Sequence, residues 1–205
     1  MRSFDPRRVG ALECRAWVAY YRREWPKLLV ASVGLVRAGF RLRWFRVPYG
    51  AWLVLRANQL WAPADNDPDG ARRCMERFYR LVAVDSGESI DTAEAARREV
   101  AWWRAHRAVQ RGPERPGERG GGSGADRERQ RAELVEALVD LYSYVYGDER
   151  DDVRPAAALR ADAMDVSDQW VAEGCDIASP LVVQERELLV RSYAALLSVI
   201  HRQSS

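Results

Sequence analysis

The chain has 205 residues, of which 47% are hydrophobic and 30% are charged, so it is long enough to bury a sizeable core and is neither disordered nor fibrous in composition. Its three cysteines, Cys14, Cys74 and Cys175, are isolated along the chain, which argues against a disulfide framework or a cysteine-based zinc site and fits a reducing cytoplasm. The N-terminal residues lack the apolar segment of a secretory signal, and the apolar run at 28–40 is too short to cross a bilayer. We therefore expect a cytoplasmic globular protein with no transmembrane segment.

Apolar residues recur with the period of an α-helix along almost the whole chain, and no segment alternates with period two. The predicted helices, about seven in all, cover residues 9–43 with a kink or restart at Pro26, 51–61, 68–84, 92–110, 126–147, 156–173 and 181–202. Asp67 followed by Pro68 is typical of a helix start, and so is Asp91 or Thr92. The helix at 51–61 is apolar nearly all round, which predicts burial on most of its sides.

Residues 111–125 are rich in glycine, proline and charge, which predicts a flexible surface linker between two helical halves. The other connections are short. Short connections between helices favour an all-α bundle with antiparallel neighbours, and we expect residues 1–205 to form a single domain.

Charge is unevenly distributed along the chain. Residues 1–60 hold 12 basic and three acidic residues, whereas residues 132–205 hold six arginines and 14 acidic residues. Such a split indicates either an anionic partner at the basic end or two ends that pack together and neutralise each other. We favour the second interpretation, because no helix-turn-helix signature points to nucleic acid.

The segment 20–48 mixes arginine, aromatic and aliphatic residues, and such a segment could lie on an anionic membrane or bind a partner helix. Its arginines do not keep to one polar face. We therefore favour a partly buried helix with a basic solvent side over peripheral membrane contact.

The stretch EVAWWRAHR at 99–107 contains one of the two histidines in the chain. Glu99 and His106 are seven residues apart, so on a helix they point within about 20° of each other. Trp102 and Trp103 lie on either side of that direction, which predicts that the carboxylate and the imidazole share the buried face. Burial shifts the pKa of such groups, and this makes Glu99 and His106 the candidate acid–base pair.

The same two residues are separated by two helical turns, or ~10 Å of rise, which is too far for both to bind one metal ion easily. Neither histidine follows a glutamate by three positions, as a carboxylate-bridged di-iron bundle requires. The acidic clusters at 133–140, 148–152 and 162–168 are interpreted as solvated faces or turns. No metal or cofactor is predicted.

The favoured hypothesis is that a small, largely apolar molecule binds in an aromatic-lined pocket between helices. Its walls are expected to come from Trp17, Trp102 and Trp103, with polar groups on predicted inward faces around the ligand, namely Glu24, Arg56, Glu99, His106 and Arg186. Buried ion pairs, Glu99 with Arg186 or Glu24 with Arg56, are the alternative interpretation of these polar groups.

Two other functions stay open. The chain could be a homo-oligomer or an assembly subunit whose tryptophans and arginines contact a protein partner. A metal-dependent bundle oxidase is the weaker alternative. Whether the protein is an enzyme at all is left open by the sequence.

Overall fold

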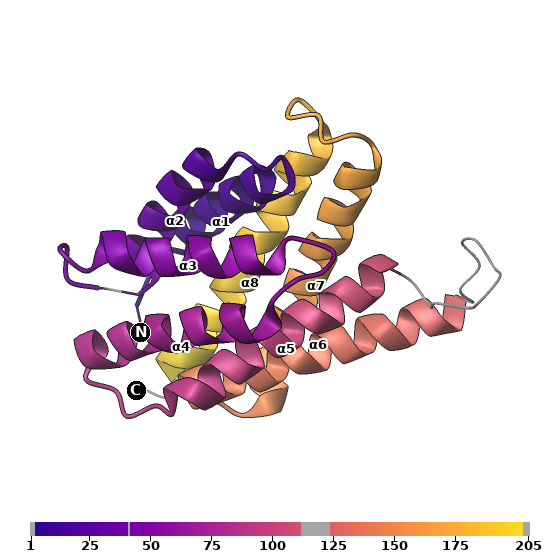
Figure 1. Cartoon of the computed structure of the whole chain (residues 1–205). Helices are drawn as coiled ribbons and strands as arrows, with labels where there is room; N and C mark the ends of the chain where they lie inside the picture. The colour runs from indigo at the N-terminus through magenta and orange to yellow at the C-terminus, as the bar shows by residue number, and fades with distance from the viewer. Residues whose placement is uncertain (1–2, 41, 112–123, 203–205) are drawn as a thin grey trace.

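The computed structural model describes residues 3–40, 42–111 and 124–202, and within these ranges it contains eight α-helices and no β-strand (Figure 1). The helices are α1 (Pro6–Tyr21), α2 (Trp25–Gly39), α3 (Val47–Trp61), α4 (Pro68–Ser86), α5 (Thr92–Arg111), α6 (Gly124–Tyr146), α7 (Arg150–Ala172) and α8 (Pro180–Arg202). The predicted all-α bundle is confirmed. Of the predicted linker, Arg111 ends α5 and Gly124 begins α6, whereas residues 112–123 lie outside the described residues.

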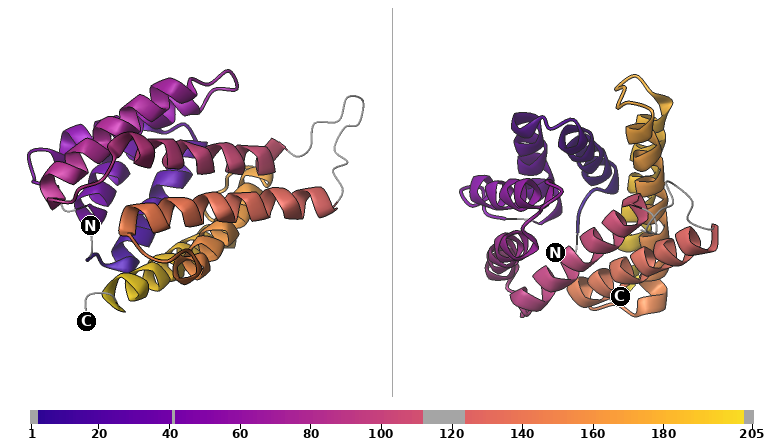
Figure 2. Two further views of the ribbon diagram at one scale, coloured as in Figure 1. Left: turned by 90° about the horizontal axis from the view of Figure 1, so that it is seen from below. Right: turned by 45° about the vertical axis from the view of Figure 1, so that its right-hand side comes forward.

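The helices close into a ring. Each helix packs against the next one along the chain, and α8 packs against α1. The helices of the first half of the chain therefore face those of the second half across the molecule (Figure 2). Apolar side chains from both halves meet in one large core cluster that includes residues of α2 through α8.

Helix starts follow the predicted signals at several positions. The Asp67 carboxylate accepts a hydrogen bond of 2.8 Å from the Gly70 amide, and a Cβ at Gly70 would lie only 2.1 Å from that carboxylate. Asp91 accepts from the backbone amide of Ala93 at 3.0 Å and so caps α5. A turn with Arg23 at a positive φ of 58° separates α1 from α2, which has Pro26 in its first turn. Pro26 thus restarts the helix.

Three predicted boundaries are wrong by four or more residues: the helix predicted to reach residue 43 ends at Gly39, and two helices near prolines begin earlier than predicted. The third helix begins at Val47 instead of residue 51, because a proline in the first helical turn needs no amide hydrogen bond. The seventh begins at Arg150 instead of residue 156 and contains Pro155. The predicted acidic turn is the first turn of α7, where the carboxylates of Asp151 and Asp152 meet the positive end of the helix dipole.

The helix α3 is also less buried than its sequence predicts. Trp52 is 46% exposed and Arg56 is exposed, although the opposite side of the helix is packed in the core. None of the helices within the described ranges is both long and apolar enough to cross a membrane.

The ring closes where α1 meets α8. At Gly10 the two backbones are so close that a Cβ would lie 2.8 Å from the Val190 amide nitrogen. The basic N-terminal segment and the acidic C-terminal segment therefore pack together at this seam.

Glu185 of α8 is fully buried near Cys14 of α1 and Ser167 of α7. Among the described residues, neither of its carboxylate oxygens has a hydrogen-bond partner. Burial, assisted by the charge of Glu13, raises the pKa of Glu185 to about 8. The carboxyl group is therefore protonated at neutral pH.

This buried carboxyl predicts a pH-dependent stability. Between the ordinary pKa of 4.5 and the folded-state pKa of about 8, the folded chain holds a proton that the unfolded chain has lost. As the pH rises across that interval, the free energy of unfolding should therefore fall by about 1.4 kcal/mol for each pH unit. Glu185→Gln should remove most of this slope in urea-unfolding curves, whereas the exposed Glu187→Gln on the same helix should keep it. A slope that persists unchanged in Glu185→Gln contradicts the assignment.

Candidate functional site

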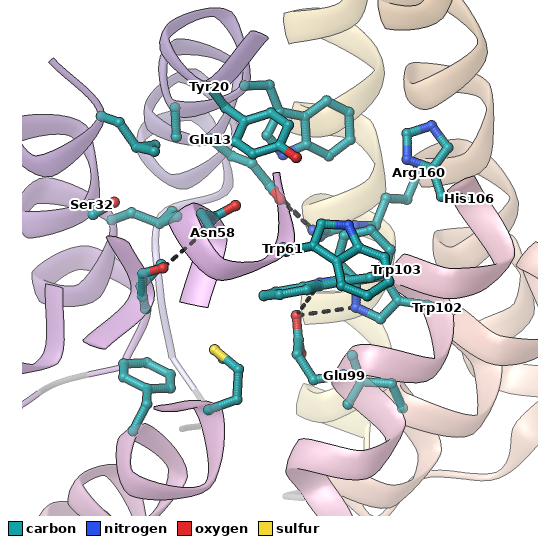
Figure 3. Close-up of a pocket in the computed structure, with 18 of the residues that line it drawn as sticks. Glu13, Tyr20, Ser32, Asn58, Trp61, Glu99, Trp102, Trp103, His106 and Arg160 are labelled. Atoms are coloured by element: carbon teal, nitrogen blue, oxygen red, sulfur yellow. Dashed lines mark hydrogen bonds and ion pairs between the residues drawn. The ribbon is translucent and has the colours of Figure 1, made fainter. Parts of the chain in front are cut away.

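A cavity of about 550 Å³ lies inside the ring, and every one of the eight helices contributes at least one side chain to its lining (Figure 3). Trp17, Trp102 and Trp103, the predicted wall residues, all line it, and Trp61 of α3 joins them. The ring of Trp103 lies 5.7 Å from that of Trp61 and 6.0 Å from that of Trp102. The tandem tryptophans of α5 therefore form an aromatic wall across the cavity.

Glu99 holds this wall in place. Its carboxylate accepts hydrogen bonds from the indole nitrogens of Trp102 at 3.1 Å and Trp103 at 3.2 Å, as Figure 3 shows. The Tyr79 hydroxyl donates a third bond at 2.8 Å. Burial raises the pKa of Glu99, although these hydrogen bonds and the charge of Arg160 act in the opposite direction. The carboxylate is thus committed to positioning aromatic side chains.

A buried ion pair crosses the cavity lining between Glu13 of α1 and Arg160 of α7. Burial acts to lower the pKa of Arg160, but the Glu13 carboxylate outweighs this effect and the pKa is raised well above its ordinary value. The Tyr193 hydroxyl donates to Glu13 at 2.5 Å, and the Arg160 guanidinium donates to the Tyr142 hydroxyl at 3.2 Å. Side chains of α1, α6, α7 and α8 therefore meet in one hydrogen-bonded cluster.

The guanidinium of Arg160 also stacks on the aromatic wall. Its central carbon lies 5.2 Å from the Trp102 ring centre and 5.7 Å from that of Trp17. These cation–π contacts tie the ion pair to the tryptophans.

His106 and Glu99 both line the cavity, but each has its own partners. The His106 Nε2 atom lies 3.1 Å from a carboxylate oxygen of Asp168, and Gln110 donates to the other oxygen at 2.7 Å. Asp168, which its helix pattern assigns to a solvated face, is therefore the partner of the histidine. The sequence pattern placed Glu99 and His106 on one face and gave no sign of this contact from α7.

The solvent-exposed residues of the lining identify the mouth of the cavity. Five of the lining residues are exposed, and they come from the α1–α2 turn, the segment after α3 and the end of α5: Arg23, Pro63, Ala64, Gln110 and Arg111. Arg23 donates to the Ala62 carbonyl at 3.2 Å, and Arg111 donates to the Ala64 carbonyl at 3.4 Å. These contacts hold the three segments together around one opening.

A third arginine, Arg107, lies just inside this opening and donates to the Trp61 and Pro63 carbonyls at 2.6 and 3.1 Å. Burial lowers the pKa of Arg107, and the charges of Arg111 and Arg23 lower it further. In the part of the chain that the structure describes, these three arginines bond to carbonyl groups and none forms a salt bridge. Within the described ranges, the mouth therefore carries positive charge that is not paired with a carboxylate.

Three predicted ligand-binding residues lie outside the cavity. Glu24 precedes α2 and pairs at the surface with Arg22 and Lys27. Arg56 is exposed, and its guanidinium contacts the Gln59 side chain. Residues 54 and 58 of α3 face the cavity, and Arg56 is two positions from each of them, which is a rotation of about 200° around the helix axis. Its side chain therefore points away from the cavity.

Arg186 is exposed because its neighbour Glu185 takes the buried position on α8. The suggested pairs Glu99 with Arg186 and Glu24 with Arg56 are wrong, since these side chains have the other partners or positions described above.

Sequence reasoning missed Arg160 and with it the Glu13–Arg160 pair, although Glu13 beside the Trp17 stripe was a candidate polar group of a shared site. The signal for Arg160 was present, because this residue lies on the apolar stripe of α7, which is formed by Val153, Ala156, Ala157 and Met164. An arginine at such a position requires a buried partner.

Among the described residues, no three His, Cys, Asp or Glu side chains lie close enough together to hold a metal ion. Comparison of the chain with models of known protein families, with curated proteins and with solved structures gives no match. The geometry of the cavity is therefore the basis for assigning a function.

The buried ion pair predicts a strong coupling between two distant positions. Glu13→Gln should lower the free energy of unfolding by about 3–5 kcal/mol, because it leaves the Arg160 charge buried without a counterion. The double variant Glu13→Gln/Arg160→Met should be more stable than Glu13→Gln alone. A double-mutant cycle in urea measures the coupling, and strictly additive effects would contradict the ion pair.

Proposed function

We propose that the protein binds a small, largely apolar molecule with an anionic end, whose apolar part occupies the central cavity and whose anionic group meets the arginines at the mouth. The observation that carries this proposal is the combination of an aromatic and aliphatic cavity of about 550 Å³ with three arginines at its opening that form no salt bridge with a described residue. A cavity of this size falls within the range of small-molecule sites, which run from about 300 to 1,000 Å³.

The interior favours an apolar occupant because its carboxylates already have partners and its arginine is paired with Glu13. Among the side chains of the lining residues that the structure describes, only the Arg160 Nε atom is buried without a hydrogen-bond partner. The Glu99 carboxylate accepts three hydrogen bonds, and Glu13 neutralises Arg160. A polar ligand atom placed there would have to displace one of these contacts, at the cost of leaving a buried group unpaired. Aliphatic side chains complete the lining, among them Leu28, Leu35, Val36 and Met75.

The mouth favours an anion for the complementary reason. A guanidinium group presents several N–H donors in a planar fork that matches a carboxylate or a phosphate. Arg23, Arg107 and Arg111 each bond to backbone carbonyls and keep further donors available.

The length of the site also fits an extended molecule. Glu99, deep in the cavity, and Arg111, at the mouth, are twelve residues apart on α5, which corresponds to about 18 Å. We therefore expect a linear chain to lie along α5 with its charged end at Arg111.

A matched set of ligands tests the proposal. Dodecanoate, dodecyl phosphate, dodecanol and dodecylammonium share one chain and differ in the head group. Below their micelle concentrations, quenching of tryptophan fluorescence should show that both anions bind at least about tenfold more tightly than the alcohol, and that the ammonium binds most weakly. If none of the four ligands binds, or if the ammonium binds best, the proposal is wrong.

Variants separate the contribution of the mouth from that of the cavity. Arg23→Gln/Arg111→Gln should weaken the two anions about tenfold and bring them closer to the alcohol, since it removes two of the three positive charges at the opening. Arg104→Gln is the matched control, because Arg104 is exposed on α5 and does not line the cavity. Asn58→Phe should weaken every ligand, because the ring extends into the cavity. Thermal unfolding of each variant verifies that the fold is kept.

A further inference from the structure

A cluster of aromatic side chains is exposed at the opposite end of α3 from the mouth of the cavity. Trp44 is 84% exposed, Phe45 53%, Tyr49 46% and Trp52 46%. The Trp44 and Phe45 rings pack edge to face with centres 5.9 Å apart, and the Tyr49 and Trp52 rings stack at the same distance. We call these four residues the aromatic patch. Trp44 and Phe45 precede α3, and Tyr49 and Trp52 lie in its first turns; Figure 1 shows the position of this helix.

The patch is a separate site from the cavity. Tyr49, Trp52 and Arg56 recur at helical spacing on the outer side of α3, whereas Val54, Asn58 and Trp61 face the cavity. From Tyr49 to Ala62 the helix rises by roughly 20 Å. The inference below therefore does not rest on the proposed ligand.

The segment of the chain that contains the patch carries charged side chains of positive sign only. Residues 25–64 contain six basic residues and no aspartate or glutamate. Arg37 and Arg56 are exposed, and Arg43 and Arg46 place their guanidinium groups 5.1 and 5.7 Å from the Phe45 ring centre while pairing with Asp85 of α4. One carboxylate from a neighbouring helix thus meets two of these arginines, whereas Arg37 and Arg56 form no salt bridge with a described residue.

We infer that the aromatic patch, with the arginines around it, docks the protein on the surface of an anionic lipid membrane. Exposed apolar groups in one contiguous patch mark an interaction surface. Tryptophan and tyrosine prefer the boundary between lipid head groups and hydrocarbon, because one part of each ring is apolar and the other can donate a hydrogen bond. Basic residues beside them add attraction to anionic lipids, about 1 kcal/mol for each residue close to the surface. A lipid surface satisfies both features at once.

Vesicle co-sedimentation tests the inference with the full chain. The protein should sediment with vesicles of phosphatidylcholine and phosphatidylglycerol in equal amounts, and should stay largely in solution with phosphatidylcholine alone. High salt should release it, since the basic residues act through screened charge. Equal binding to both kinds of vesicle, or no binding to either, would overturn the inference.

Variants locate the surface. Trp44→Ser/Trp52→Ser should lower the partition onto anionic vesicles at least about fivefold, because it removes the two largest rings from the interface. Ile177→Ser is the matched control, since Ile177 is 65% exposed but lies between α7 and α8. It should bind like the unchanged protein, and an equal loss in this control would mean that the patch is not the site.

A second variant keeps the test independent of the aromatic residues. Arg37→Gln/Arg56→Gln should also weaken binding to anionic vesicles at least about fivefold and flatten its dependence on salt. Analytical ultracentrifugation of the same proteins distinguishes the competing occupant. The membrane inference is wrong if three results are found together: the unchanged chain self-associates, Trp44→Ser/Trp52→Ser abolishes the self-association, and neither protein binds vesicles. The patch is then an interface between copies of the chain.

Discussion

The buried ion pair between Glu13 and Arg160 is the contact on which the closed ring of helices depends. The pair joins the first helix to the seventh, and the hydroxyl groups of Tyr142 and Tyr193 connect it to the sixth and the eighth. A buried charge is tolerated only with its partner in place, so Arg160 requires that α1 dock against the C-terminal half of the chain. Gly10 makes this docking possible, because it lets the backbones of α1 and α8 approach.

Closing the ring in this way also determines what the cavity can hold. Because Arg160 is neutralised by Glu13 and stacks on Trp17 and Trp102, its charge does not attract a ligand into the interior. The Glu99 carboxylate likewise already accepts hydrogen bonds from the indole groups of Trp102 and Trp103. Of the arginines that line the cavity, those that form no salt bridge with a described residue lie at the mouth instead. A chamber with an apolar interior and a charged entrance follows from where the ion pairs are made.

The sequence predicted the helices well because their signals are local: apolar periodicity, and side chains such as Asp67 and Asp91 that bond to nearby amides. It also placed Glu99 and His106 on the face of α5 that the structure directs at the cavity. It failed where a side chain's role is decided by another helix. The partner of His106 comes from α7, and Glu185 displaces Arg186 from the buried side of α8. Periodicity gives the direction of a side chain relative to its own helix, and it does not say what the neighbouring helix presents there.

The helix α3 shows the same limit in a form that bears on function. A segment that is apolar nearly all round is typical of a helix buried on every side. In this structure the apolar character serves two different surfaces: Val54 and Trp61 face the cavity, while Tyr49 and Trp52 face outward. The inner face requires apolar residues because it lines the chamber. Packing within the described chain does not account for the outer one, where rings remain exposed beside arginines. A helix with two apolar faces, one enclosed by its own chain and one exposed, fits the proposed docking on a membrane, because its outer rings are not covered by the described chain.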